Sequence, residues 1–334
     1  MDRVAGSRPR VHRIEVPCGA SGRAVNVYLL PGRVPTLVDT GPALPGTAAR
    51  VARAADAAGV PLAGVAQIIL THTHQAHAGA LAALHAGCGA PILLHPRGVH
   101  AVTDPRAEHA ARAGLLDRVA RAAGAPPAIV DALATWEAAV ESPGGVDGRA
   151  LRPVDHGDVV PAGDDDWMVL HLPGHAPDQL VLQHVASGTV LAGDLVLRDR
   201  ATRPALEPRG AEGRPHTLAD LIASLLALGR LDASIILPGH GPPIRAHRVL
   251  IARRLADIRA RLQTVRSIVA GRPRSLWDVA RHLGGPVDDA AEAADRLAIA
   301  VAYSDWLAQR GWAARHVRDG IVFIERRAAP ARRR

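Results

Sequence analysis

The sequence predicts an α/β domain followed by a smaller helical domain. Short runs of leucine, isoleucine and valine alternate with alanine-rich stretches as far as about residue 245, a pattern typical of strands alternating with helices. From residue 246 onward, long arginine-studded amphipathic segments replace the strand pattern. Apolar residues make up 48% of the 334 residues, which is ample for a buried core, and this length allows about two domains.

The predicted strands are short apolar runs bounded by glycine, proline or polar residues. They lie at residues 25–30, 36–38, 65–70, 91–95, 167–171, 180–184, 189–192 and 234–237. Glycine after an alanine-rich stretch marks helix ends at Gly59 and Gly87. Helices are predicted at residues 47–58, 78–86, 106–123, 127–140 and 218–228.

The C-terminal part predicts three helices and a hairpin. The helices span residues 247–270, 275–283 and 290–310, and the strands span 312–317 and 321–325. Between these strands lies Asp319-Gly320, a dipeptide that favours a hairpin turn. The order is typical of a winged-helix-like domain. We therefore expect a first domain over residues 10–245 with a helical insertion near its pocket at 97–141, a helical domain over 246–327, and a basic disordered tail over 328–334.

Charge and cysteine content narrow the class of protein. The formal net charge is +8 and every basic side chain is arginine. Because arginine is spread throughout, nucleic acid is a less favoured partner than a small-molecule or acyl-carrier-linked substrate. Cys18 and Cys88 cannot build a disulfide framework, and no run of eighteen apolar residues occurs. Since the start also lacks a signal-peptide pattern, we expect a cytoplasmic protein without membrane contact.

Histidine is frequent, at 17 residues, and three histidines follow one predicted strand closely. His72 and His74 are two residues apart, and His77 follows. On a helix, the side chains of residues i and i+2 point about 200° apart. At the end of a strand they lie on the same face. His77 joins them if the chain turns into a helix there. The spacing therefore suits a loop that presents three imidazoles to one point.

Three further strands end beside metal-ligand residue types. His175 follows Pro173-Gly174, Asp194 follows Gly193, and His240 lies within Pro-Gly-His-Gly-Pro. Glycine beside each of them allows tight backbone turns, and side chains at neighbouring strand ends converge on one rim. Five histidines and one aspartate are the ligand set for one or two borderline-soft cations. Zinc fits this set best, with iron or manganese as alternatives.

These motifs resemble those of the metallo-β-lactamase superfamily. That family's motif reads T-H-x-H-x-D-H, followed by P-G-H, by G-D and by a late P-G-H-G-P; here the corresponding residues are 71–77, 173–175, 193–194 and 238–242. Asn26 and Asp39 also resemble its opening strands. The resemblance covers roughly residues 12–245 and implies an αββα sandwich with metals at the rim between two sheets. The C-terminal part resembles the winged-helix-like extension of the subgroup similar to β-lactamase-like protein 2.

The resemblance implies a role for each residue of the rim. The residues implied to bind the first metal are His72, His74 and His175, those of the second are His77 and His240, and Asp194 bridges both. It also implies that Asp39 orients a ligating imidazole from behind. Hydrolysis by activated water then follows, with Asp194 and His240 among the residues that take part in catalysis.

The sequence departs from the family at position 76. The family has an aspartate there, which binds the second metal and handles the proton of the nucleophile, whereas this chain has Ala76. We expect the first metal to be retained, the second weakened and hydrolysis slowed or abolished. Two origins fit the departure, a natural variant and an inactivating substitution, and the intact remainder of the motif favours the second.

Three functions remain open at this stage. The first is hydrolysis of a carboxylic ester, thioester or lactone by metal-bound hydroxide. A hydroxyacylglutathione hydrolase proper is less favoured, because that group uses lysine and this chain has none. The second is RNA or phosphodiester hydrolysis, which the net charge and the C-terminal domain favour and the scarcity of aromatic residues disfavours. The third is a non-catalytic metal- or ligand-binding homologue.

Overall fold

The computed structural model describes residues 8–18, 24–139, 143–204, 206, 217–285, 287 and 289–327. Contacts divide the chain into two compact units. The first contains residues 1–109, 141–202 and 220–252, and the second contains 110–140, 203–219 and 253–334. Residues 110–140 therefore group with the C-terminal residues, because the helix formed by residues 127–138 packs against the helix formed by 290–309. The sequence alone does not indicate this grouping. The expected basic tail, 328–334, lies outside the described residues.

The first sheet of the first unit is antiparallel at one edge and parallel at the other. Its strands, in spatial order, are β1 (His12–Pro17), β2 (Ala24–Leu30), β3 (Thr36–Val38), β4 (Gln67–Ile69), β5 (Ile92–Leu94) and β6 (Leu151–Pro153). The pairs from β3 to β6 are parallel. Successive side chains alternate between the faces, so Ile68 packs with Leu84 of the outer core and Ile69 packs with Trp167 of the inner core.

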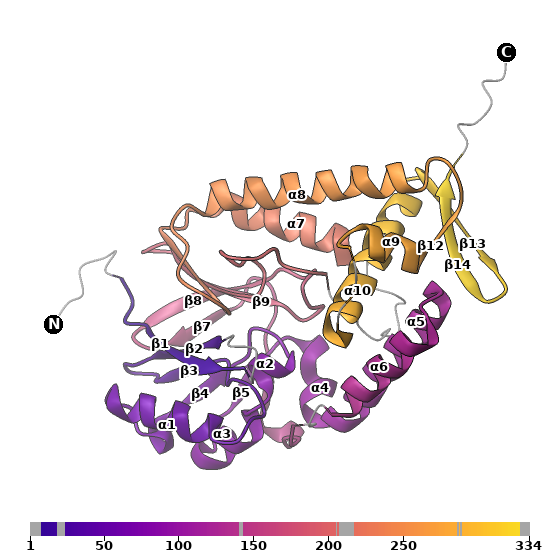
Figure 1. Ribbon diagram of the computed structural model, residues 1–334. Coiled ribbons are helices and arrows are strands. Elements are labelled where there is room, and N and C mark those ends of the chain that lie inside the picture. Colours follow the sequence, from indigo (N-terminus) through magenta and orange to yellow (C-terminus); the bar gives the residue numbers. More distant parts are fainter. Residues whose placement is uncertain are drawn as a thin grey trace. The chain divides into compact units, whose positions relative to one another are not determined.

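The second sheet faces the first across the inner core. Its strands are, in spatial order, β11 (Ile235–Pro238), β10 (Thr189–Gly193), β9 (Leu180–His184), β8 (Asp165–His171) and β7 (Val159–Ala162). Helices α1 (Thr47–Ala57) and α3 (Leu81–Cys88) cover the first sheet, and α7 (Thr217–Arg230) covers the second (Figure 1). The unit is thus the αββα sandwich that the sequence predicts.

Short helical segments connect these layers. They are η2 (Leu62–Gly64), α2 (Gln75–Ala78), η3 (Pro96–Gly98), α4 (Val99–Thr103) and η4 (Gly148–Ala150). Of these, α2 matters for function because it begins directly after His74 and contains His77. The chain therefore becomes helical at Gln75, three residues before the predicted helix start at residue 78. None of the helices among the described residues is long and apolar enough to cross a bilayer.

The second unit is a helical domain with a small sheet. Its helices are α5 (Pro105–Ala123) from residue 110 onward, α6 (Pro127–Ala138), the later part of α8 (His247–Ile268), α9 (Leu276–His282) and α10 (Ala290–Gln309). Its sheet has the order β12 (Arg274–Ser275), β14 (Ile321–Arg326) and β13 (Ala313–Arg318). Asp319 and Gly320 both have positive φ, of 51° and 77°, as the predicted hairpin turn requires.

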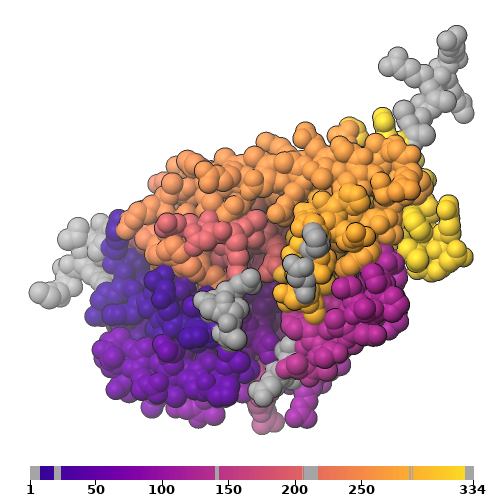
Figure 2. Space-filling view, viewed as in Figure 1, coloured from indigo at the N-terminus to yellow at the C-terminus, as the bar shows by residue number. Residues whose placement is uncertain are grey.

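The end of α5 lies against the hairpin of this unit. A Cβ added to Gly124, just after α5, would lie 3.1 Å from Ile321 Cγ2 on β14. Figure 2 shows the surfaces of these two segments meeting, α5 in magenta and the hairpin in yellow. Ser275 begins α9 by accepting the Asp278 N–H at 3.0 Å, which satisfies a helix-end donor.

Replacing Trp167 with alanine should test the packing between the two sheets. The Trp167 side chain is fully buried, and its indole N–H donates to the Ala162 carbonyl at 3.2 Å. We expect Trp167→Ala to lower the free energy of unfolding by about 3–5 kcal/mol, because it leaves a cavity and an unpaired carbonyl. Urea denaturation followed by circular dichroism measures this. The control is Trp312→Ala, at a site 50% exposed, with an expected loss below about 1 kcal/mol; equal losses would contradict the assigned core.

Candidate metal centre

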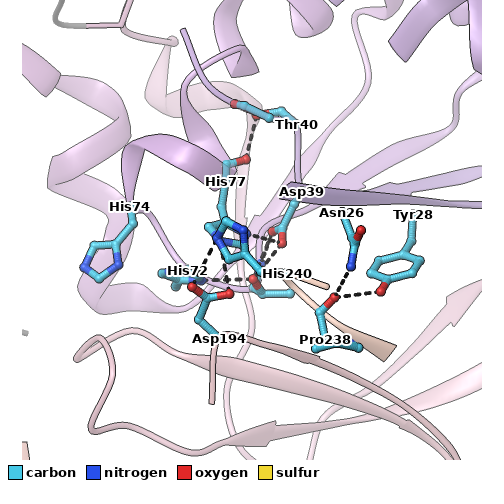
Figure 3. Close-up of polar contacts among 12 residues, drawn as sticks. Asn26, Tyr28, Asp39, Thr40, His72, His74, His77, Asp194, Pro238 and His240 are labelled. Atoms are coloured by element: carbon cyan, nitrogen blue, oxygen red, sulfur yellow. Dashed lines mark hydrogen bonds and ion pairs between the residues drawn. The ribbon is translucent and has the colours of Figure 1, made fainter. Parts of the chain in front are cut away.

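Six predicted site residues come together at one rim of the sandwich. His72 and His74 lie in the loop after β4, and His77 lies on α2. The other three follow strands of the second sheet: His175 after β8, Asp194 after β10 and His240 after β11. Parallel pairing of β10 with β11 places the last two side by side. Figure 3 shows His77, His240 and Asp194 converging from the two sheets.

The Asp194 carboxylate lies close to three of the histidines. Its Oδ1 lies 3.4 Å from His77 Nε2, and its Oδ2 lies 3.4 Å from His240 Nε2 and 3.7 Å from His175 Nε2. A further pair, His74 Nδ1 and His175 Nε2, are 3.0 Å apart. Ligands of a tetrahedral cation at about 2.0–2.1 Å are separated by about 3.3 Å, so these spacings suit one ion held among several side chains.

Contacts at the Nδ1 atoms fix the orientation of three of the histidine rings. His77 Nδ1–H donates to Asp39 Oδ2 at 2.8 Å, and His240 Nδ1–H donates to the Ala24 carbonyl at 2.6 Å. The Thr71 hydroxyl donates to Asp39 and lies 3.1 Å from His72 Nδ1. In all three rings the Nδ1 side is engaged, which leaves Nε2 directed at the centre.

Unpartnered buried atoms show that the rim fits a cation. His72 Nε2, His77 Nε2 and Asp194 Oδ1 are buried without a hydrogen-bond partner among the described residues. Buried polar atoms that make no hydrogen bond are costly, and here His77 Nε2 and Asp194 Oδ1 lie 3.4 Å apart as an ion pair. At the rim, two groups of three ligand atoms each lie within 4.8 Å: those of His72, His74 and His175, and those of His72, His77 and Asp194. Nitrogen and carboxylate donors in these numbers suit a divalent cation.

The rim carboxylates and imidazoles set one another's protonation. Burial by itself would raise the pKa of Asp194, but the neighbouring His77, His175 and His240 hold that pKa well below its usual range. Burial and then the adjacent imidazoles lower the pKa of His72. Asp194 and Asp39 outweigh burial at His77 and raise its pKa to about 10. A cation entering at His77 Nε2 therefore displaces a proton.

The loop after β11 depends on close backbone approach. A Cβ at Gly239 would overlap Asp194 Oδ1 and lie 2.6 Å from His77 Cε1. Asn26 holds this loop, since its side-chain amide donates to the Pro238 and Gly241 carbonyls, both at 2.8 Å. Tyr28 donates to the Pro238 carbonyl at 2.7 Å (Figure 3).

Two supporting residues are not indicated by the sequence motifs. Asp178 Oδ2 accepts the Thr73 N–H at 2.9 Å and so fixes the first histidine loop. Tyr28 is predicted from the sequence only as part of its strand. For Asp178 the available signal is its position three residues after His175; nothing in the sequence near Tyr28 points to Pro238, 210 residues away.

Ala76 lies on α2 beside His77 and is half-buried. Its methyl group offers no donor atom where the family motif has a carboxylate. The second part of the rim therefore consists of His77, His240 and Asp194.

A separate histidine cluster lies at the ends of β5, β6 and β8. The rings of His95 and His171 stack at 3.8 Å with 17° between their planes, and His95 Nε2 lies 3.4 Å from Asp155 Oδ1. His171 Nε2–H donates to the Pro177 carbonyl at 2.8 Å. Nearly parallel rings cannot both aim an in-plane lone pair at one cation, so this cluster is a packing feature of the sandwich.

Comparison with known proteins gives consistent matches. Residues 20–240 match the model of the metallo-beta-lactamase superfamily. Over 273 residues the chain is 30% identical to the probable metallo-hydrolase YqjP of Bacillus subtilis (strain 168), a match that covers 81% of this chain and 83% of that protein.

Solved structures share the fold over nearly the whole chain. The metallo-beta-lactamase family protein TTHA1429 from Thermus thermophilus has a TM-score of 0.78 and 24% identity, covering 95% of this chain and 98% of that chain. A beta-lactamase domain protein from Burkholderia ambifaria has a TM-score of 0.74 and 23% identity, covering 98% and 94%.

Gly239→Ala should weaken metal binding. The added methyl group must displace Asp194 or the His77 ring, so we expect a loss of affinity for Zn²⁺ of at least about tenfold, the usual size when a support of a metal site is disturbed. Competition with a chromogenic chelator measures the affinity. The control is Gly271→Ala, where an added Cβ meets no atom within 4 Å. Unchanged affinity in Gly239→Ala would argue against the centre as described.

His95 should make folding stability depend on pH. Burial and then His171 lower the pKa of His95 from 6.5 to about 4. Between these values the unfolded chain binds more protons than the folded chain, so this contribution is complete above pH 6.5 and is lost as the pH falls toward 4. We expect His95→Asn to show a shallower fall in urea-unfolding free energy over that window, and exposed His156→Asn to keep the wild-type slope. Equal slopes would rule the effect out.

Proposed function

Because the chain belongs to the metallo-β-lactamase superfamily, we propose that it is a metal-dependent hydrolase of a carboxylic ester, thioester or lactone. The observation that carries this proposal is the convergence of His72 Nε2, His77 Nε2 and Asp194 Oδ1, which are buried and make no hydrogen bond among the described residues. The substrate class extends to small-molecule and acyl-carrier-linked acyl groups. The printed name of the Bacillus subtilis relative supports metallo-hydrolysis and specifies no substrate.

We assign the rim residues to two positions. His72, His74 and His175 hold the first cation, and His77 and His240 form the weaker second position. Asp194 lies between the two. Zinc suits this nitrogen-rich set, with iron and manganese as the alternatives to be measured. When bound, a divalent cation supplies Lewis acidity, which activates water and polarises the carbonyl group of the substrate.

The chain's own residues position the reactants. Asp39 holds His77, and the Ala24 carbonyl holds His240, so neither ring turns during the reaction. With Ala76 in place of an aspartate, the carboxylate left at the rim to accept a proton is Asp194.

The second position decides which electrophile is favoured. Phosphodiester hydrolysis commonly relies on two cations that together stabilise the attacking and the leaving oxygen. A carbonyl electrophile needs one Lewis acid, which a three-histidine site provides. Since Ala76 removes a ligand from the second position only, the remaining rim supports carbonyl chemistry better than phosphodiester chemistry.

Metal analysis and a substrate panel test the proposal. Elemental analysis should find a divalent metal in the purified protein at about one ion per chain, the capacity of a single three-histidine site. The panel consists of a chromogenic ester, a thioester, a lactone and bis-p-nitrophenyl phosphate. We expect turnover of the acyl substrates to exceed that of the phosphodiester, and chelation to abolish it. Faster cleavage of the phosphodiester or of RNA would contradict the acyl substrate class and indicate a phosphodiesterase. A metal-containing protein without turnover would indicate a non-catalytic binding homologue.

Ala76→Asp should increase both metal content and rate. The added carboxylate supplies a ligand to the second position and a second proton acceptor. Proton transfer by a positioned group contributes at least about 100-fold, so we expect kcat to rise by about that amount. Ala76→Asn is the matched control, because it has the same shape without the charge or the basicity. Equal rates for wild type and Ala76→Asp would contradict the role given to this position.

A further inference from the structure

A groove in the second unit has no place in hydrolysis at the metal centre. It has a volume of about 460 Å³ and lies between the C-terminal end of α8, α10, the start of β13 and the end of β14. The residues that line it are Gln263, Arg266, Ser267, Val269, Ala270, Leu307, Trp312, Ala313 and Arg326. The Arg326 N–H donates to the Val269 carbonyl at 3.3 Å, so the end of β14 lies beside the end of α8 (Figure 1).

One wall of the groove is an exposed face of a helix and of the residues that follow it. Gln263, Arg266, Ser267 and Ala270 have helical spacing and are all exposed. Trp312 also lines the groove and is 50% exposed, whereas Trp277 in the same unit is 6% exposed. A half-exposed tryptophan in a concave surface is unusual unless a partner covers it.

Arginine gives the groove a positive charge. The Arg266 guanidinium carbon lies 3.7 Å from the centre of the Trp312 ring, so the guanidinium stacks on one face of the indole. Arg326 lines the groove as well, and none of the described residues in the lining is an aspartate or glutamate. Within the described part of the chain, neither arginine forms an ion pair, whereas Arg296 and Arg315 pair with acidic residues. The groove therefore combines a planar apolar surface with two cationic groups.

We propose that this groove binds a phosphorylated nucleoside. The base extends the Arg266–Trp312 stack by packing on its exposed side, since Trp312 keeps half of its surface exposed, and the phosphate accepts hydrogen bonds from Arg266 and Arg326. The volume falls within the range of about 300–1,000 Å³ typical of small-molecule pockets. A nucleic acid strand is bound by a succession of stacking surfaces, and the groove offers a single one, which favours one nucleotide over a strand. The proposal does not depend on what the metal centre hydrolyses.

Calorimetric titration of the full chain tests the ligand chemistry. The probe is adenosine 3′,5′-bisphosphate, the nucleotide part of coenzyme A, compared with adenosine, inorganic phosphate and a hexaadenylate. We expect the bisphosphate to bind at least about tenfold more tightly than adenosine or phosphate, a difference of about 1.4 kcal/mol. No binding of the bisphosphate, or equal binding of phosphate alone, overturns the proposal. Much tighter binding of the hexaadenylate would overturn the proposal and indicate that the groove binds a nucleic acid strand.

Three variants and one control test the location. Arg266→Gln and Arg326→Gln should each weaken bisphosphate binding about tenfold, because each removes a charged hydrogen bond. Trp312→Leu should weaken it with no change in the thermal melting of the ligand-free protein. The control is Arg310→Gln, whose guanidinium lies 4.8 Å from the Trp306 ring and outside the groove lining. Wild-type affinity in both groove arginine variants overturns the assignment, as does an equal loss in Arg310→Gln.

Discussion

The Asp39 carboxylate is the constraint on which the rim depends. It accepts the His77 Nδ1–H at 2.8 Å, the Thr71 N–H at 2.8 Å and the Thr71 hydroxyl, whose oxygen in turn lies beside His72 Nδ1. One buried side chain thus orients a histidine from each half of the first motif. Asp39 itself has a positive φ of 63°, a conformation that aspartate tolerates better than most residues. The turn places the carboxylate against His77 and, through the Thr71 hydroxyl, behind His72.

Two glycines allow the loops of the second sheet to approach the rim closely. Gly193, with φ of 49°, and Gly239 lie where a Cβ would meet Thr71, Gln179, His77 or Asp194. These contacts join the loops after β10 and β11 to the loop after β4. Because Asn26 and Tyr28 of the first sheet also hold the Pro238 carbonyl, the two sheets are tied together at the ligands themselves. Any separation of the two sheets at this edge would therefore also disrupt the site.

The sequence predicts that the six rim residues come together, because each motif is local. A ligand, its glycine and the strand before it lie within a few residues, and parallel strand ends then bring the motifs together. Features that depend on distant contacts are not predictable in this way. The grouping of residues 110–140 with the C-terminal unit depends on the packing of α6 on α10, and the His95–His171 stack joins residues 76 positions apart. Strand β1 is not predicted although Ile14 and Val16 alternate with exposed residues, because six residues give a weak pattern.

Charge balance at the rim supports the proposal that Ala76 weakens the second position. Asp194 is 5% exposed and Asp39 is 1% exposed, so charge at the rim is poorly solvated. The Asp194 carboxylate faces the centre directly, and the Asp39 carboxylate acts on it through His77. One divalent cation brings +2 and balances them. A second would leave two positive charges uncompensated in a buried site, which is strongly unfavourable. An aspartate at position 76 would halve that excess, so we expect Ala76 to disfavour a second cation through electrostatics as well as through the missing ligand atom.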